Sequence, residues 1–186
     1  EEQADEPHAS RWIVLIAYLM GLSIGVHILN LLCIPAIVLV VYYKKFANPT
    51  GKGSLIALLI SFVIVGLMLY GLVPGFIKMA QRFELIFVNG MHLGFNMGAL
   101  IYAVVLVAAF CWAIYELYRQ KNPLMIKISF LIAVFFSGIF WLGNSTLALF
   151  GLTIALAVYL FVTKKLPVRI LNITAISILV IFVGYS

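Results

Sequence analysis

Charged residues are scarce in this chain. Only 10% of its 186 residues are charged, while 65% are hydrophobic. A soluble domain is about half apolar and about a quarter charged. The apolar residues also form long continuous runs, whereas the strands of a membrane barrel alternate in polarity over segments of about 10 residues. The composition therefore predicts an all-α integral membrane protein without a soluble domain.

Cysteine clusters and common catalytic motifs are also missing. The two cysteines, Cys33 and Cys111, both lie inside apolar runs, so we expect buried hydrophobic side chains rather than a disulfide. The sequence contains no metal-ligand spacing of His and Cys, no glycine-rich nucleotide loop and no nucleophile elbow. It gives no reason to expect a metal or another cofactor.

The basic residues are placed unlike those of a nucleic-acid-binding protein. The formal net charge is +6, but the Lys and Arg residues lie in the short gaps between apolar runs. These gaps are where membrane proteins carry their orientation signals. We therefore interpret the positive charge as a signal of topology and expect no nucleic-acid partner.

Acidic residues are concentrated at the start of the chain. Four of the six lie within residues 1–6, which is opposite in charge to the first part of a signal peptide. We interpret residues 1–11 as a polar cytoplasmic lead-in and residues 12–186 as a single helical transmembrane domain. The chain does not begin with Met and ends within an apolar run, so we expect a fragment of a larger membrane protein.

The stretch from Trp12 to Tyr43 is the most informative apolar run. Its 32 residues would form one helix of about 48 Å, although a hydrocarbon core of about 30 Å needs roughly 20 residues. Its polar turn, His27–Asn30, predicts a hairpin of two short helices, Trp12–Val26 and Leu31–Tyr43. The alternative is one long tilted helix with a kink near Pro35.

The remaining apolar runs bring the predicted number of transmembrane helices to about seven. The additional five predicted spans are Ser54–Leu72, Met97–Tyr118, Leu124–Leu142, Leu147–Val162 and Val168–Tyr185. The glycines and proline of Gly71-Leu-Val-Pro-Gly75 predict the end of the first of these five spans.

Phe76–Val88 differs from the predicted spans. Aromatic residues recur there at helical spacing on one side, and Lys78, Gln81 and Arg82 occupy the other. This pattern predicts an interfacial amphipathic helix. The alternative is a partly buried helix that packs on the spans.

The basic residues predict the orientation of the spans. With seven spans, ten basic residues fall on one side and two on the other; with one span from Trp12 to Tyr43, the division is nine to three. The majority side should be cytoplasmic. The ten residues are Arg11, Lys44, Lys45, Lys52, Arg119, Lys121, Lys127, Lys164, Lys165 and Arg169, and the two are Lys78 and Arg82.

Several polar residues should gather at the non-cytoplasmic face. Glu84 is the single carboxylate predicted there; it could act as a base or bind a hydroxyl, but a structural hydrogen bond or a pair with Lys78 is the favoured interpretation. His27 could contact a lipid phosphate or cap a helix end. Lys78 and Arg82, four residues apart, suit an anionic headgroup or simply solvate one face of the helix.

Several short motifs resemble a known family. They are Ala4-Asp-Glu-Pro-His8 with Arg11-Trp12, Gly21-Leu-Ser-Ile-Gly-Val-His-Ile-Leu-Asn-Leu31 before a Pro-containing span, Phe83-Glu-Leu-Ile-Phe-Val-Asn-Gly90, Phe95-Asn96 with Gly98, and Gly184-Tyr-Ser186. Together they make most of the chain similar to a bacterial family of multi-pass membrane proteins related to protein O-mannosyltransferases.

The resemblance implies a glycosyltransferase of the GT-C type in the bacterial inner membrane. Such enzymes transfer a sugar from a polyprenyl-phosphate carrier on the non-cytoplasmic side. Their acidic base typically lies in the first external loop, and no loop of this chain matches it, so the catalytic residue of the parent protein is expected outside this chain. Whether the chain itself is an enzyme stays open.

The resemblance also suggests where the carrier phosphate or substrate binds. His27 stands nearest to the basic residue that the corresponding hairpin carries in several GT-C proteins. The full set of candidate residues is His27, Asn30, Lys78, Arg82, Glu84, Asn89 and Asn96. The implied partners are membrane lipids, a polyprenyl-phosphate-linked sugar, a protein acceptor and the remainder of the parent polypeptide.

Two other classes of protein fit the same sequence. A transporter or lipid-handling membrane protein would line a pathway with polar residues, and a structural membrane subunit would use them only to cap helices. A pathway needs ionisable groups near the middle of the membrane. Apart from His27, this chain keeps such groups near the ends of its spans, which favours a transferase or a structural subunit.

Overall fold

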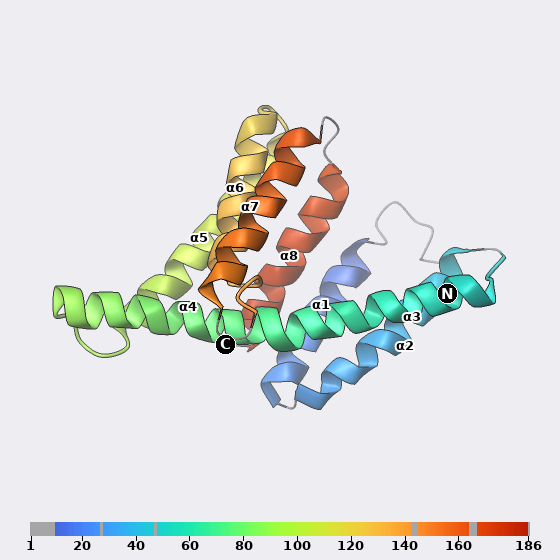
Figure 1. Ribbon diagram of the computed structural model, residues 1–186, viewed down its shortest axis with the longest axis horizontal. Coiled ribbons are helices and arrows are strands. Elements are labelled where there is room, and N and C mark those ends of the chain that lie inside the picture. Colours follow the sequence, from blue (N-terminus) through green and yellow to red (C-terminus); the bar gives the residue numbers. More distant parts are fainter. Residues whose placement is uncertain (1–9, 27, 47, 143–144, 164–166, 186) are drawn as a thin grey trace. The chain divides into compact units, whose positions relative to one another are not determined.

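The computed structural model describes residues 10–26, 28–46, 48–142, 145–163 and 167–185. These residues are predominantly helical and contain no strand, which confirms the predicted all-α class (Figure 1). They divide into two compact units, one of residues 1–69 with 180–186 and one of residues 70–179. The two units are described separately below.

Within the described residues, three helical stretches are long and apolar enough to cross a membrane. They are Gly51–Gly90, Met97–Arg119 and Val168–Tyr185. Shorter apolar helices cover Arg11–Ile24, Pro123–Ser137 and Thr146–Val162. The structure therefore supports a membrane protein, while the predicted count of seven spans stays a prediction.

The first unit begins with two short helices, as predicted for the hairpin. Helix α1 (Ser10–Val26) is followed by a 3-10 helix (Ile28–Leu32) and then by α2 (Cys33–Lys45). The chain reverses direction between α1 and α2 (Figure 1), so the alternative of one long helix is wrong. Pro35 lies in the first turn of α2, where its missing N–H leaves no hydrogen bond unmade.

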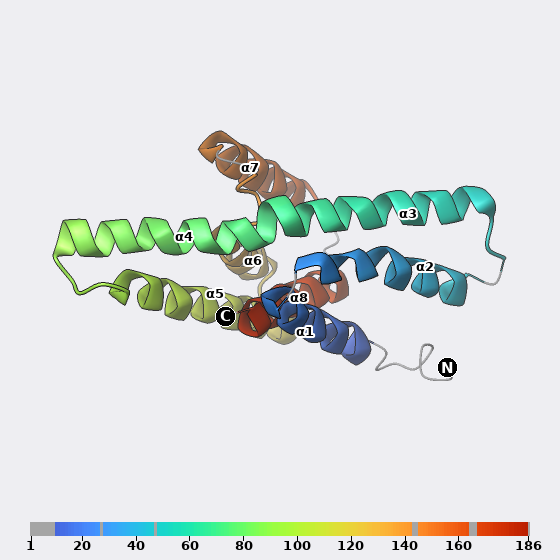
Figure 2. The same cartoon turned by 90° about the horizontal axis from the view of Figure 1, so that it is seen from below.

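Polar side chains bond to free backbone groups at two helix ends of this unit. Asn30 Nδ2 donates to the Ser23 carbonyl oxygen at 3.2 Å, and Ser23 O is one of the last α1 carbonyls that have no partner within the helix. Helix α3 (Gly51–Gly66) runs beside α2 (Figure 2). At its start, Thr50 Oγ1 accepts from the Gly53 N–H at 3.2 Å, as an N-cap does.

The helix that begins with α3 does not stop where the sequence predicts. A π-helical segment (Leu67–Leu72), α4 (Val73–Leu85) and a second π-helical segment (Ile86–Gly90) follow directly. Helical structure is continuous over the 40 residues Gly51–Gly90. The predicted break at Gly71–Gly75 is therefore wrong. Prolines are tolerated in membrane helices where π adjustments satisfy the freed backbone groups, and here a π segment ends at Leu72, two residues before Pro74.

In the second unit, α4 packs against α5 (Met97–Arg119), and α5 packs against α6 (Pro123–Ser137) (Figure 2). The Phe83 ring lies 5.4 Å from the Tyr102 ring and 6.0 Å from that of Phe136, centroid to centroid. Phe76 and Met79 are buried. The aromatic side of α4 thus packs on α5 and α6, as in the alternative of a partly buried helix. A position at the membrane interface stays a prediction.

The connection after α6 also differs from the prediction. Helix α6 ends at Ser137 rather than at Leu142, because Gly138 adopts a left-handed conformation with φ of 66° that glycine accommodates without strain. Ser145 Oγ then accepts from the Ala148 N–H at 3.2 Å and starts α7 (Thr146–Val162). The last helix is α8 (Val168–Tyr185).

Candidate functional site

Glycines bring α4 into backbone contact with the turn after α6. A Cβ at Gly138 would lie 2.7 Å from the Gly75 carbonyl oxygen, and a Cβ at Gly75 would lie 2.6 Å from the Gly138 carbonyl carbon. Real Cβ atoms do not approach neighbours so closely. One turn earlier, a Cβ at Gly71 would overlap the Ile139 carbonyl oxygen. Small residues four apart allow helices to approach closely, and here they dock α4 on a turn.

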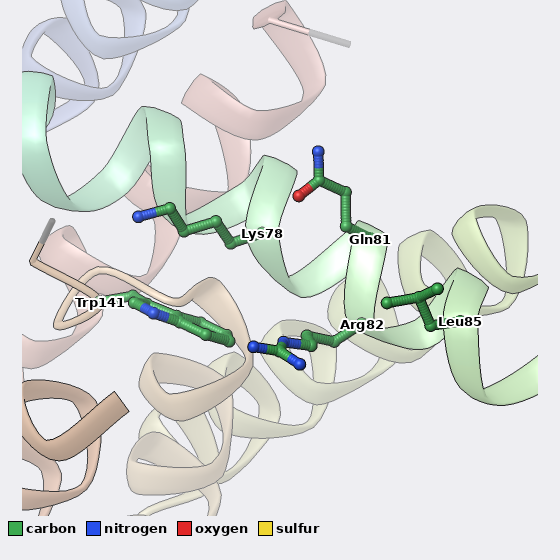
Figure 3. A pocket seen from close by; sticks show the side chains of 5 residues that line it. All are labelled: Lys78, Gln81, Arg82, Leu85 and Trp141. Carbon is green, nitrogen blue, oxygen red and sulfur yellow. The ribbon is translucent and has the colours of Figure 1, made fainter. Parts of the chain in front are cut away.

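An open pocket of about 470 Å³ lies along α4 beside this turn. It is lined by Lys78, Gln81, Arg82, Leu85 and Trp141 (Figure 3). The first four recur on one side of α4, and Trp141 comes from the turn after α6. The close approach of Gly75 and Gly138 is therefore what places Trp141 against the polar side of α4.

The chemistry of the pocket favours an anion. Two of its five lining residues are cationic and none is acidic. The Arg82 guanidinium lies over the Trp141 ring, with its central carbon 5.7 Å from the ring centroid, within the range of a cation–π contact. A guanidinium offers a planar fork of N–H donors and an ammonium a compact charge, and both bind phosphate and carboxylate groups.

Glu84 has a structural role that accounts for both of its oxygens. Oε1 accepts from the Asn96 N–H at 2.5 Å, and Oε2 accepts from the Ala99 N–H at 2.9 Å. Both amides belong to the start of α5, where backbone N–H groups lack partners within the helix and a negative charge is favourable. The structural hydrogen bond predicted for Glu84 is confirmed, and any contact with substrate stays a prediction.

The structure separates the other sequence candidates by place. Asn96 is the N-cap residue of α5 with φ of 68°, and its side chain makes no capping bond. Asn89 is exposed in the π-helical segment after α4. Asn30 belongs to the first unit, where it bonds to α1. His27 lies outside the described residues, so its gathering with Lys78 and Arg82 stays a prediction.

Sequence reasoning missed Trp141 altogether. It assigned the residue to a predicted span, Leu124–Leu142, whereas Trp141 lies four residues beyond the end of α6. One local signal was available, because a glycine such as Gly138 commonly follows the last residue of a helix. The contact between Trp141 and Arg82 is long-range, so no local pattern predicts it.

The comparisons with known proteins concern a different part of the chain. Residues 1–50 match the family model described as the Protein O-mannosyl-transferase TMEM260 N-terminal domain. No curated protein and no solved structure matches the chain at a significant level. The start of the chain, including the hairpin of α1 and α2, is thus similar to a protein O-mannosyltransferase family, and the pocket lies beyond the matched segment.

Proposed function

We propose that this chain is the membrane-embedded part of a polyprenyl-phosphate-sugar-dependent glycosyltransferase that resembles protein O-mannosyltransferases and belongs to the GT-C type. The observation that carries the proposal is the family match over residues 1–50. The apolar helices and the cationic pocket support it independently of that match. The proposed location is the bacterial inner membrane, with the start of the chain in the cytoplasm and Lys78 and Arg82 on the opposite side.

In this proposal the pocket binds the phosphate of the lipid carrier. Transfer breaks the bond between the anomeric carbon of the sugar and the phosphate oxygen, and the phosphate keeps the electron pair. Its negative charge grows as the bond breaks, and fixed cations and N–H donors stabilise such charge most where water is excluded. Lys78 and Arg82 supply permanent cations to this phosphate.

The acceptor side of the reaction lies outside this chain. A hydroxyl oxygen of the protein acceptor forms the new bond to the anomeric carbon, and its proton passes to a carboxylate of the parent polypeptide. Glu84 is not assigned that role, because both of its oxygens bind backbone amides at the start of α5. Glu84 instead keeps α5 positioned against α4, the helix that carries the two cations.

A lipid-handling membrane protein is the second candidate. The pocket favours it, because an open site with two cations and no acidic lining residue suits any lipid with an anionic headgroup. Such a protein would bind the carrier lipid without breaking the bond between sugar and phosphate. The two proposals therefore differ in one measurable product, the glycosylated acceptor.

The deciding experiment uses membranes that contain the full-length protein. Radiolabelled polyprenyl-phosphate mannose is supplied with a Ser- and Thr-rich acceptor peptide, and membranes that lack the protein are the control. The proposal predicts labelled peptide that survives alkaline phosphatase and is absent from the control. Binding of the donor without any labelled peptide would favour the lipid-handling protein.

A further inference from the structure

Trp141 is held in place by the turn that carries it. Its backbone N–H donates to the Gly138 carbonyl oxygen at 2.8 Å, and the Ile139 backbone N–H donates to Ser137 Oγ at 3.3 Å. The backbone contact between Gly138 and Gly75 holds the same turn against α4. Only 6% of Trp141 is exposed. The indole is therefore a fixed wall of the pocket rather than a mobile side chain.

The Trp141 indole restricts the conformations of the Arg82 side chain. A long arginine side chain at an exposed position has many rotamers, and Arg82 is exposed. The contact with the Trp141 ring restricts the guanidinium to one region, because its central carbon lies over the ring, 5.7 Å from the centroid. The guanidinium carries N–H donors in a planar fork, which suits the oxygens of a phosphate ligand.

Lys78 completes the arrangement from the preceding turn of the same helix. Residues four apart lie one above the other on a helix, and Figure 3 shows the side chains of Lys78 and Arg82 beside Trp141. Leu85 and the indole add apolar surface next to the two cations. The pocket thus joins a place for an anionic group to a place for a short apolar segment.

We propose that Trp141 is a positioning residue that orients the Arg82 guanidinium, so that Arg82 and Lys78 together bind the phosphate group of a lipid. The ligand class is a phosphate joined to an apolar chain, found both in a polyprenyl phosphate and in an ordinary phospholipid. The identification of the polyprenyl carrier as the occupant rests on the proposed function. The role of Trp141 does not, because it follows from the geometry of the pocket.

The test measures binding rather than sugar transfer. The full-length protein is placed in nanodiscs of uncharged phosphatidylcholine and titrated with farnesyl phosphate by calorimetry. We expect Trp141→Leu and Arg82→Lys each to weaken binding at least about fivefold, because each removes the cation–π contact between the Arg82 guanidinium and the indole. Trp141→Phe keeps an aromatic face and should weaken binding less than Trp141→Leu.

The double variant separates positioning from general stability. If Trp141 acts through Arg82, the double variant Trp141→Leu/Arg82→Lys should bind about as weakly as either single variant. A loss equal to the product of the two single effects would overturn the proposal, as would wild-type affinity in Trp141→Leu. Trp141→Phe is the variant to rely on if Trp141→Leu fails to fold, and its affinity should then fall between that of the wild type and that of Arg82→Lys.

Titrations with further ligands identify the chemical class of ligand that the pocket binds. Farnesol, which lacks the phosphate, should not bind, and inorganic phosphate should bind more weakly than farnesyl phosphate; equal affinity in either comparison would overturn the ligand class. Adding phosphatidylglycerol to the nanodiscs should leave the affinity for farnesyl phosphate unchanged if the carrier is the occupant. A fall in proportion to the phosphatidylglycerol content would identify the occupant as bulk phospholipid.

The outcomes also separate this inference from the proposed function. If the double variant shows that Trp141 acts through Arg82 but the protein transfers no sugar, the inference stands and the transferase is rejected. Sugar transfer with no effect of Trp141→Phe or Trp141→Leu on binding would keep the transferase and reject the inference.

Discussion

The hairpin of α1 and α2 and the pocket beside α4 use their polar residues in opposite ways. In the hairpin, the amide of Asn30 bonds inward to the end of α1. In the pocket, Lys78 and Arg82 line an open space with no acidic neighbour in its lining. The family match covers the hairpin and not the pocket. The similarity in sequence and the candidate site thus lie in different stretches of the chain, and each needs its own test.

The variant with the largest expected effect, Gly75→Ala, disrupts the pocket and leaves the hairpin unchanged. Gly75→Ala places a Cβ against the Gly138 backbone, so we expect the free energy of unfolding to fall by about 3 kcal/mol, the upper end of the usual range for overpacking. Unfolding by sodium dodecyl sulfate in mixed micelles measures this.

Gly151→Ala is the matched control for Gly75→Ala. Its Cβ would meet nothing within 4 Å, and alanine is the better helix former by about 1 kcal/mol. We expect stability equal to or slightly above that of the wild type. Equal losses in the two variants would mean that the contact between Gly75 and Gly138 does not hold α4 to the turn.

The next effect tests the hairpin. We expect His27→Ala in the full-length protein to lower glycan transfer at least about tenfold, a cautious fraction of what one lost transition-state donor usually costs. Expression and membrane insertion should be normal. His92→Ala is the control, because His92 is an exposed histidine of the second unit. Equal rates in the wild type and His27→Ala would leave His27 with the role of a helix cap.

The smallest effect concerns the cap of α5. Glu84→Gln removes the negative charge and one of the two acceptors that bind the Asn96 and Ala99 amides. We expect a loss of about 1–2 kcal/mol in the free energy of unfolding, because charge-assisted hydrogen bonds contribute about that much. Glu116→Gln removes the same charge elsewhere and should change stability by less than about 0.5 kcal/mol. An unchanged stability in Glu84→Gln would contradict the capping role.

Much of the fold could be predicted, because long apolar runs determine where membrane helices lie. The predicted spans Met97–Tyr118, Leu147–Val162 and Val168–Tyr185 agree with α5, α7 and α8 to within a residue. The hairpin break also followed from its polar turn, His27–Asn30. The break at Gly71–Gly75 was wrong because glycine and proline usually end a helix, whereas here the glycines serve the contact with Gly138.

Only the residues that α4 contributes to the candidate site could be predicted from the sequence. The spacing of Lys78 and Arg82 places both cations on one face of a helix, and the structure has them in one pocket. Trp141 comes from a turn 59 positions after Arg82 (141 minus 82), and only the folded chain brings the two together. Glu84 was predicted to be structural from its surroundings, but its partners at Asn96 and Ala99 depend on how α5 packs on α4.

The most direct test of the account is glycan transfer by the full-length protein with Lys78 and Arg82 both replaced by alanine. Arg119→Ala/Lys121→Ala, which removes one Arg and one Lys at the end of α5, is the control of equal charge. With protein amounts equalised, the account predicts a rate at least about tenfold lower for Lys78→Ala/Arg82→Ala, because the leaving phosphate loses its cations, and a nearly normal rate for the control. A wild-type rate in Lys78→Ala/Arg82→Ala would contradict it.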